Sequence, residues 1–118
     1  MSPSPTPITL TVFYPADPDA TFDHDYYVNT HMPMAEKLWR PMGMLGYRTF
    51  KVRSPTPFGD AAPYSVVTIV EFSSAAAWEE AFKLAPEHLM PDIPNYSNKP
   101  PLFFVGERFG GSVGVVME

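Results

Sequence analysis

The sequence predicts an α+β fold in which helices cover an antiparallel sheet. Three observations indicate this fold. Strand-like segments with period-two alternation or β-branched runs occur at residues 8–14, 46–53, 64–72 and 102–109. Segments with helical spacing separate the first two strands and the last two strands, and the middle strands are joined by a loop alone. The order β-α-β-β-α-β is that of the ferredoxin-like fold.

The first strand is ITLTVFY, residues 8–14, where Ile8, Leu10, Val12 and Tyr14 alternate with the residues between them. Residues 1–7 precede it and are expected to be a flexible N-terminal tail. The 15 prolines lie mostly between periodic segments, so they are expected to separate elements rather than interrupt them.

The first helix is predicted in the stretch DHDYYVNTHMP, residues 23–33. Asp23 suits an N-cap, and a helix to about residue 30 is expected after it. Pro33 lacks a backbone donor and disfavours helical geometry in the residue before it. We therefore expect the helix to kink or restart at Pro33, with His31 at the interruption, and to continue through MAEKLW to the breaker PMG.

The second half follows the same pattern. Residues 46–53 and 64–72 are expected to be strands, separated by the loop SPTPFGDAAP. Ser73 or Ser74 can cap a second helix, in which Trp78 and its apolar partners recur at helical spacing up to Pro86. The stretch from Glu87 to Pro100 is expected to be irregular, 102–109 a last strand, and 110–118 a C-terminal tail. Residues 8–109 form the domain.

The predicted strands carry apolar residues on both faces. A sheet with one face in water normally alternates apolar and polar side chains, whereas LFFV at residues 102–105 is apolar throughout. A second copy of the chain is the simplest cover for the face opposite the helices, because two-fold dimers are the commonest oligomers. We therefore expect a homodimer built sheet to sheet, with space for a ligand.

The composition excludes several functions. A net charge of −5 is unsuited to a nucleic-acid partner, and no apolar run reaches the length of a membrane span. The sequence has no cysteine, and no metal site is predicted, since His24 and His31 are too far apart on a helix. No nucleotide-binding motif is present, which leaves any cofactor unknown. A cytoplasmic location is expected.

Three motifs resemble the EthD family, named for a protein of ethyl tert-butyl ether breakdown. They are Tyr26-Tyr27, His31-x-Pro33 and DIPNYSN at residues 92–98, and the resemblance spans about residues 8–108. It implies a ferredoxin-like monomer that dimerises into an α/β barrel. Members of the family are labelled as reductases or as accessories of oxidative degradation. Proteins of the same architecture include cofactor-free monooxygenases, lactone isomerases, polyketide cyclases and haem-degrading enzymes, so the fold does not choose a function.

The candidate catalytic residues are His31 and Tyr27. They lie four residues apart and share a helical face, so an imidazole and a phenol can meet one ligand as a proton-transfer pair. The alternative is that His31 packs against the backbone freed by Pro33. Tyr26 is the second choice for the phenol. The candidate ligand-binding residues are Tyr26, Asn95, Tyr96 and Asn98, although Asn and Ser after proline are also ordinary turn residues.

Two functions follow from this interpretation. The first is an EthD-like small-molecule enzyme or accessory of oxidative catabolism, of a cofactor-free oxidoreductase, monooxygenase or isomerase type, with an apolar oxygenated ligand in a barrel cavity. The alternative is a non-catalytic binding or carrier homodimer that uses the same cavity. The sequence does not identify the substrate.

Overall fold

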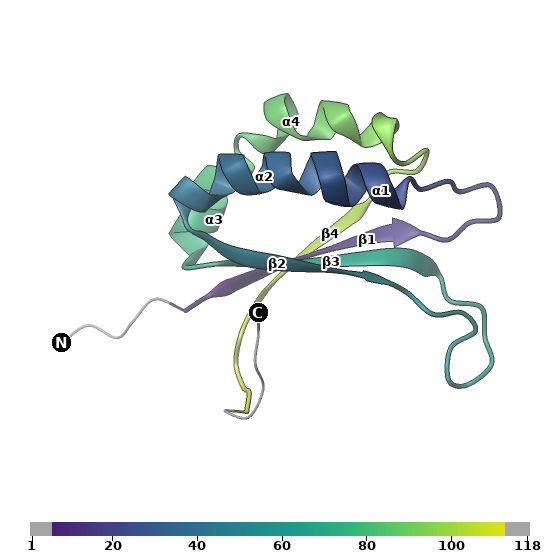
Figure 1. The fold of residues 1–118 in the computed structure, drawn as a ribbon. Coiled ribbons are helices and arrows are strands. Elements are labelled where there is room, and N and C mark those ends of the chain that lie inside the picture. Colours follow the sequence, from purple (N-terminus) through teal and green to yellow (C-terminus); the bar gives the residue numbers. More distant parts are fainter. Residues whose placement is uncertain (1–5, 113–118) are drawn as a thin grey trace.

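The computed structural model describes residues 6–112 of the chain. Its centre is a four-stranded antiparallel sheet in the order β2-β3-β1-β4, and the helices lie on one face of it (Figure 1). The predicted α+β, ferredoxin-like arrangement is therefore confirmed. The strands are β1 (Ile8–Pro15), β2 (Met44–Lys51), β3 (Tyr64–Phe72) and β4 (Leu102–Glu107).

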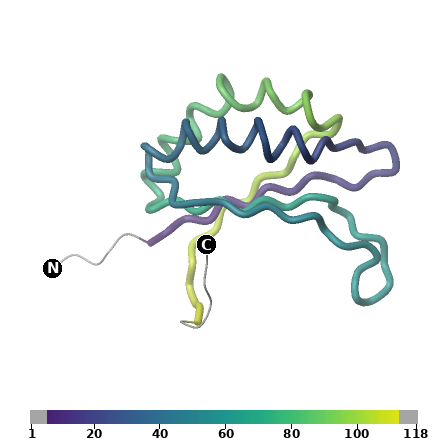
Figure 2. The backbone as a smooth tube through the Cα atoms, viewed as in Figure 1, coloured from purple at the N-terminus to yellow at the C-terminus, as the bar shows by residue number. Residues whose placement is uncertain are grey.

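Two rows of helix cover the sheet, and Figure 2 shows their backbones lying above the strands. Trp39 in the first row donates to the carbonyl of Ala81 in the second at 2.8 Å, which fixes the two rows to each other. The first row is α1 (His24–Tyr26), η1 (Tyr27–His31), α2 (Met32–Trp39) and η2 (Arg40–Met42). The second row is α3 (Ala75–Phe82), α4 (Ala85–His88) and η3 (Met90–Asn95).

Pro33 does not break the first helix, which corrects the prediction of an interruption. The chain stays helical from α1 through α2, and the residues before Pro33 form a wider π-helical turn, η1. In this turn the Met32 N–H reaches back five residues to the Tyr27 carbonyl. The wider turn accommodates a proline because the ring would otherwise meet the carbonyl four residues earlier. Asp23 caps the helix as expected, accepting from the Tyr26 N–H at 3.0 Å.

The segment after Pro86 is helical, although an irregular loop was expected there. Pro86 lies in the first turn of α4 and Pro91 in the first turn of η3. A proline in a first turn loses no helical hydrogen bond, because that N–H has no partner in any case. Closely spaced prolines therefore started two short helices here, where the sequence pattern had suggested none.

The last strand ends at Glu107, two residues earlier than predicted. Phe109 follows it with a fully exposed side chain. The predicted tails lie mainly outside the described residues, since these begin at residue 6 and end at residue 112.

The core lies between the sheet and the helices. Leu10 of β1, Val70 and Phe72 of β3, and Ala81 of α3 are almost completely buried there. On the opposite face, β4 places Phe104 beside Thr11 of β1. No described element covers this second face (Figure 1).

Candidate functional site

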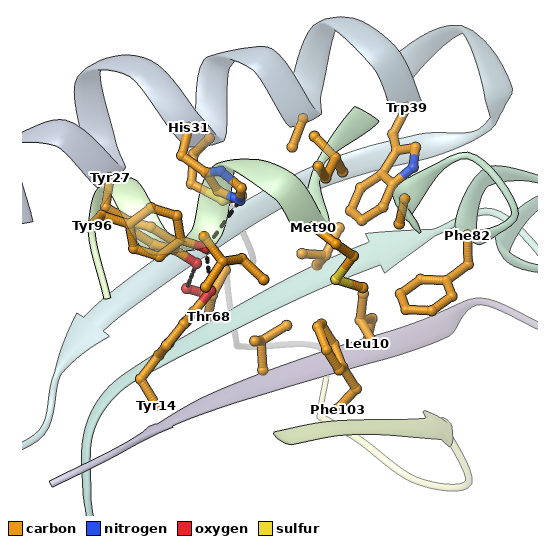
Figure 3. A pocket seen from close by; sticks show the side chains of 17 residues that line it. Leu10, Tyr14, Tyr27, His31, Trp39, Thr68, Phe82, Met90, Tyr96 and Phe103 are labelled. Carbon is orange, nitrogen blue, oxygen red and sulfur yellow. Dashed lines mark hydrogen bonds between the residues drawn. The ribbon is translucent and has the colours of Figure 1, made fainter. Parts of the chain in front are cut away.

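A cavity lies between the helices and the sheet, and Figure 3 shows the side chains that enclose it. The cavity volume is about 40 Å³, more than the roughly 10–15 Å³ that one water requires. One end is apolar and includes Trp39, Phe82, Met90 and Phe103. The other end collects the polar side chains of the wall.

His31 is the centre of the polar end. It is 6% exposed, and its Nδ1 lies 2.9 Å from Oδ2 of Asp92. Burial lowers the pKa of His31, and the Asp92 carboxylate offsets part of that effect. Because the lowered pKa favours the neutral imidazole at neutral pH and Asp92 accepts from Nδ1–H, Nε2 is a hydrogen-bond acceptor. His31 therefore presents a basic nitrogen on the cavity side.

Asp92 is held in place by two further donors. The Tyr26 hydroxyl donates to Oδ1 at 2.6 Å, and the Asn95 amide donates to the same oxygen at 2.9 Å. Burial acts to raise the pKa of Asp92, but the hydrogen bonds from Tyr26, Asn95 and His31 outweigh it and lower the pKa. The carboxylate is therefore ionised and fixes the orientation of the imidazole.

Two phenols continue the network from His31 into the sheet. The Tyr96 hydroxyl lies 3.3 Å from Nε2 of His31, and it also lies 2.6 Å from the hydroxyl of Tyr14 on β1. Burial is the largest cause that raises the pKa of both phenols. Both are therefore neutral hydroxyls across the physiological pH range.

Tyr27 stacks on His31 with ring centroids 5.5 Å apart and planes 14° from parallel. Its hydroxyl turns toward β3 and lies 2.7 Å from Thr68 Oγ1, which lies 2.9 Å from Thr49 Oγ1. Burial raises the pKa of Tyr27 well above its ordinary value. The two predicted catalytic residues therefore share the cavity, although the phenol nearest to Nε2 is Tyr96.

The other predicted residues lie at different distances from the cavity. Tyr96 lines it directly, whereas Tyr26 and Asn95 contact Asp92 behind His31. Asn98 lies in the loop region. Its side chain accepts from the Thr21 N–H at 2.7 Å and donates to the Asp19 carbonyl at 2.8 Å.

Sequence reasoning missed Asp92 and Tyr14 as members of the site. Asp92 begins the motif that supports the EthD resemblance, and it follows Pro91 at a helix start, where a carboxylate is also an ordinary residue. Tyr14 ends an alternating strand on its apolar face. The packing of η3 against the first helix row brings Asp92 to His31, and Tyr14 joins the site through Tyr96. No sequence spacing encodes these contacts.

The wall of the cavity carries no formal charge apart from any proton on His31. Its described lining residues include no Lys, Arg, Asp or Glu. In the described part of the chain, no group of three or more His, Cys, Asp or Glu side chains is placed to hold a metal ion. None of the helices within residues 6–112 is long and apolar enough to cross a membrane.

Fold and site define a ferredoxin-like protein with a small cavity between its helices and its sheet. An EthD-like protein from Ralstonia eutropha JMP134 has this fold, with a TM-score of 0.83 and 23% identity over 94% of this chain and 99% of that chain. The predicted resemblance to EthD proteins is thus confirmed at the level of the fold. The sequence matches no family model and none of the curated proteins to which it was compared.

Two further solved structures share the fold. SnoaB, a cofactor-independent oxygenase from Streptomyces nogalater, has a TM-score of 0.53 and 12% identity, covering 92% of this chain and 97% of that one. A dimeric ferredoxin-like protein from an uncultured marine organism has a TM-score of 0.52 and 10% identity, covering 92% and 99%. Because these identities are low, the likeness concerns the fold alone.

Proposed function

We propose that the protein is a small-molecule enzyme of oxidative catabolism, or an accessory to one, that binds an apolar oxygenated ligand in the cavity beneath its helices. His31 and Tyr27 act as the proton-transfer pair. Tyr96 contacts the ligand, Tyr26 and Asn95 hold Asp92, and Asn98 holds the loop beside the site. Asp92 is a positioning residue because it acts through His31.

The observation that carries this proposal is the His31–Asp92 pair at the polar end of an apolar cavity. A buried imidazole with a carboxylate on Nδ1 keeps Nε2 as an acceptor and stabilises the imidazolium that forms when it takes a proton. The apolar walls exclude water from the developing anion. The site therefore combines a general base with a pocket for an uncharged organic molecule, which is sufficient for cofactor-free chemistry on an acidic hydroxyl.

A quinol is a suitable first substrate for testing this chemistry. Nε2 takes a hydroxyl proton, the resulting anion passes two electrons to O2, and the overall products are quinone and hydrogen peroxide. We expect purified protein to accelerate oxygen uptake by a panel of simple hydroquinones. His31→Asn is expected to lower the rate by about 10²- to 10⁴-fold, the usual contribution of a general base, because asparagine keeps a hydrogen-bonding group and loses the titration.

The matched control is His88→Asn, since His88 lies on α4 and is about half-exposed. It should leave oxygen uptake unchanged. If His31→Asn kept full activity while His31→Ala lost stability, His31 would be a packing residue, and the catalytic proposal would be wrong.

The second candidate is a non-catalytic carrier that uses the same cavity. It is favoured by one observation, which is that Nε2 of His31 already has a partner in Tyr96 at 3.3 Å. Ligand binding without turnover of any quinol, lactone or ketone would support the carrier.

We also propose that the protein is a homodimer joined through the sheet face opposite the helices. This face carries large apolar side chains that remain accessible in one chain, with exposed fractions of 54% for Phe104, 47% for Phe50 and 37% for Leu102. Exposed apolar side chains gathered on a sheet usually mark an interface. The dimeric ferredoxin-like relative described above supports the same arrangement, which would place two sheets face to face in an α/β barrel.

A further inference from the structure

The hydrogen-bond donors at the polar end of the cavity are already used within the protein. This can be established by counting hydrogens, because each hydroxyl has one and a neutral imidazole has one. Asp92 is an ionised carboxylate and can only accept, so the hydrogen of His31 lies on Nδ1. Nε2 is then an acceptor, so the Tyr96 hydroxyl is the donor in their 3.3 Å contact.

The same count fixes the direction of the next bond. The Tyr96 hydroxyl donates its single hydrogen to His31. Tyr14 is therefore the donor in the 2.6 Å contact between the Tyr14 and Tyr96 hydroxyls. Tyr14 therefore has no hydrogen left for a ligand. Each phenol oxygen keeps acceptor capacity, because a hydroxyl oxygen has two lone pairs.

The remaining hydroxyls on the sheet side form a second chain. The pairs Tyr27–Thr68 and Thr68–Thr49 are within hydrogen-bond distance. In one ordering Thr49 donates to the Val67 carbonyl, Thr68 to Thr49, and Tyr27 to Thr68. In the other ordering the direction is reversed.

In the reversed ordering Thr49 donates to Thr68, Thr68 to Tyr27, and Tyr27 to Tyr14, whose hydroxyl interacts with it. Both orderings make three bonds and spend all three hydrogens. A third arrangement, in which Tyr27 and Thr49 both donate to Thr68, leaves the Thr68 hydrogen without an acceptor. It makes one hydrogen bond fewer, and buried polar groups are rarely left unpaired. Either way, Tyr27 faces the cavity as an acceptor.

The apolar end supplies no donor either. The indole Nε1–H of Trp39 is the remaining side-chain N–H in the described cavity wall, and it donates to the Ala81 carbonyl at 2.8 Å. The wall also lacks Lys and Arg. A carbonyl ligand would leave its oxygen buried without a partner, at a considerable cost, and a carboxylate would be buried without a counter-ion.

We infer that the cavity selects an uncharged compound that contributes a hydroxyl hydrogen, such as an alcohol, phenol or enol, over a carbonyl compound of the same shape. The inference rests on the proposed ligand function of this cavity and names its substrate class. The hydroxyl donates to a phenol oxygen at the polar end or to Nε2 in place of Tyr96. The apolar body of the ligand lies against the aromatic end.

The sharpest test compares three rings of nearly equal size by titration calorimetry and by the thermal unfolding midpoint. Cyclohexanol can donate, cyclohexanone can only accept, and methylcyclohexane does neither. We expect cyclohexanol to bind at least about tenfold more tightly than cyclohexanone, since an unmade buried hydrogen bond costs about this much in affinity. Methylcyclohexane measures the hydrophobic contribution alone. Cyclohexanone binding as tightly as cyclohexanol would overturn the inference and leave the cavity as a ligand site. If none of the three bound at millimolar concentration, the proposed ligand function would fail, and the inference with it.

Tyr96→Phe provides a second, independent measurement. It removes the hydroxyl that covers Nε2 of His31, and the Tyr14 hydroxyl keeps a partner in Tyr27. Cyclohexanol is therefore expected to gain affinity, because its hydroxyl can donate to Nε2 without displacing Tyr96. Cyclohexanone cannot donate and gains nothing, so the affinity ratio that favours the alcohol rises. The matched control is Tyr64→Phe, because Tyr64 contacts Phe13 away from the cavity, and it should leave the ratio unchanged. An unchanged ratio in a folded Tyr96→Phe variant would show that the hydrogen-bond chain does not set the preference.

Discussion

At the scale of single residues, His31 joins three parts of the molecule. It belongs to the first helix row and contacts Asp92 of the second row and Tyr96, which directly follows that row. Through Tyr96 it is linked to Tyr14 on the sheet. Two opposing effects act on its pKa. Burial lowers it and the carboxylate raises it, and burial is the larger. The protonation of one side chain therefore affects how three elements hold together.

The stability of the protein is expected to depend on pH through His31, whose pKa is lowered in the folded protein. A histidine whose pKa is lower in the folded protein than in the unfolded chain binds fewer protons when folded, so its contribution favours folding as pH rises. The contribution of His31 is complete above the ordinary pKa of about 6.5. It is lost as pH falls from there toward the lowered folded value. The free energy of unfolding, measured by urea titration, is expected to decrease over this window.

Two variants test whether His31 causes the pH dependence of stability. His31→Asn should flatten the dependence below about pH 6.5, whereas His88→Asn, at a half-exposed position beside Glu87, should retain it. An unchanged slope in His31→Asn would show that another group controls stability in this range. Asp92 acts at lower pH, because its lowered pKa gives stability that is lost as pH falls below the ordinary range of a carboxyl group.

At the scale of elements, Gly43 controls the passage from the first helix row to β2. It ends η2 with a φ of 115°, a backbone conformation that side-chain-bearing residues rarely adopt. A Cβ at this position would lie 2.6 Å from the Cβ of Ala77 and 2.9 Å from Oγ of Ser73. The missing side chain therefore allows the start of α3 to pack directly against the end of η2.

Gly43→Ala is expected to destabilise the protein by about 2–5 kcal/mol, from backbone strain and overpacking together. Gly59→Ala is the matched control, because Gly59 also has a positive φ of 97° and a Cβ added there would meet nothing within 4 Å. It should lose about 1–2 kcal/mol from backbone strain alone. Equal losses in chemical denaturation would show that the contact with Ala77 is not tight.

The elements show how far the sequence pattern determines structure. Alternation placed the strands within two residues of their observed ends, because burial of one sheet face leaves a period-two signal. The prolines were misinterpreted in two places. Pro33 widened a helical turn that surrounding contacts hold together, and Pro86 and Pro91 started helices. In each case, packing decided between a break and a tolerated proline, and packing is not a local property.

At the scale of the whole molecule, the candidate site could be predicted in part. His31, Tyr27 and Tyr96 follow from motif and spacing and do line the cavity. Asp92 lies 61 residues after His31 and meets it only where the second helix row docks. Tyr14 lies on β1 and is linked to His31 through Tyr96. The orientation of the hydrogen bonds, which leads to the inferred ligand class, depends on these long-range partners.

If the open sheet face is a dimer interface, Phe104→Glu should convert the protein to a monomer, because two charges would face each other in an apolar contact. The matched control is Phe58→Glu, since Phe58 is almost fully exposed in the loop between β2 and β3. Sedimentation velocity at micromolar concentration should give a dimer for the unmodified protein and for Phe58→Glu. A monomeric unmodified protein would rule out the dimer, and a dimer that survives Phe104→Glu would place its interface away from β4.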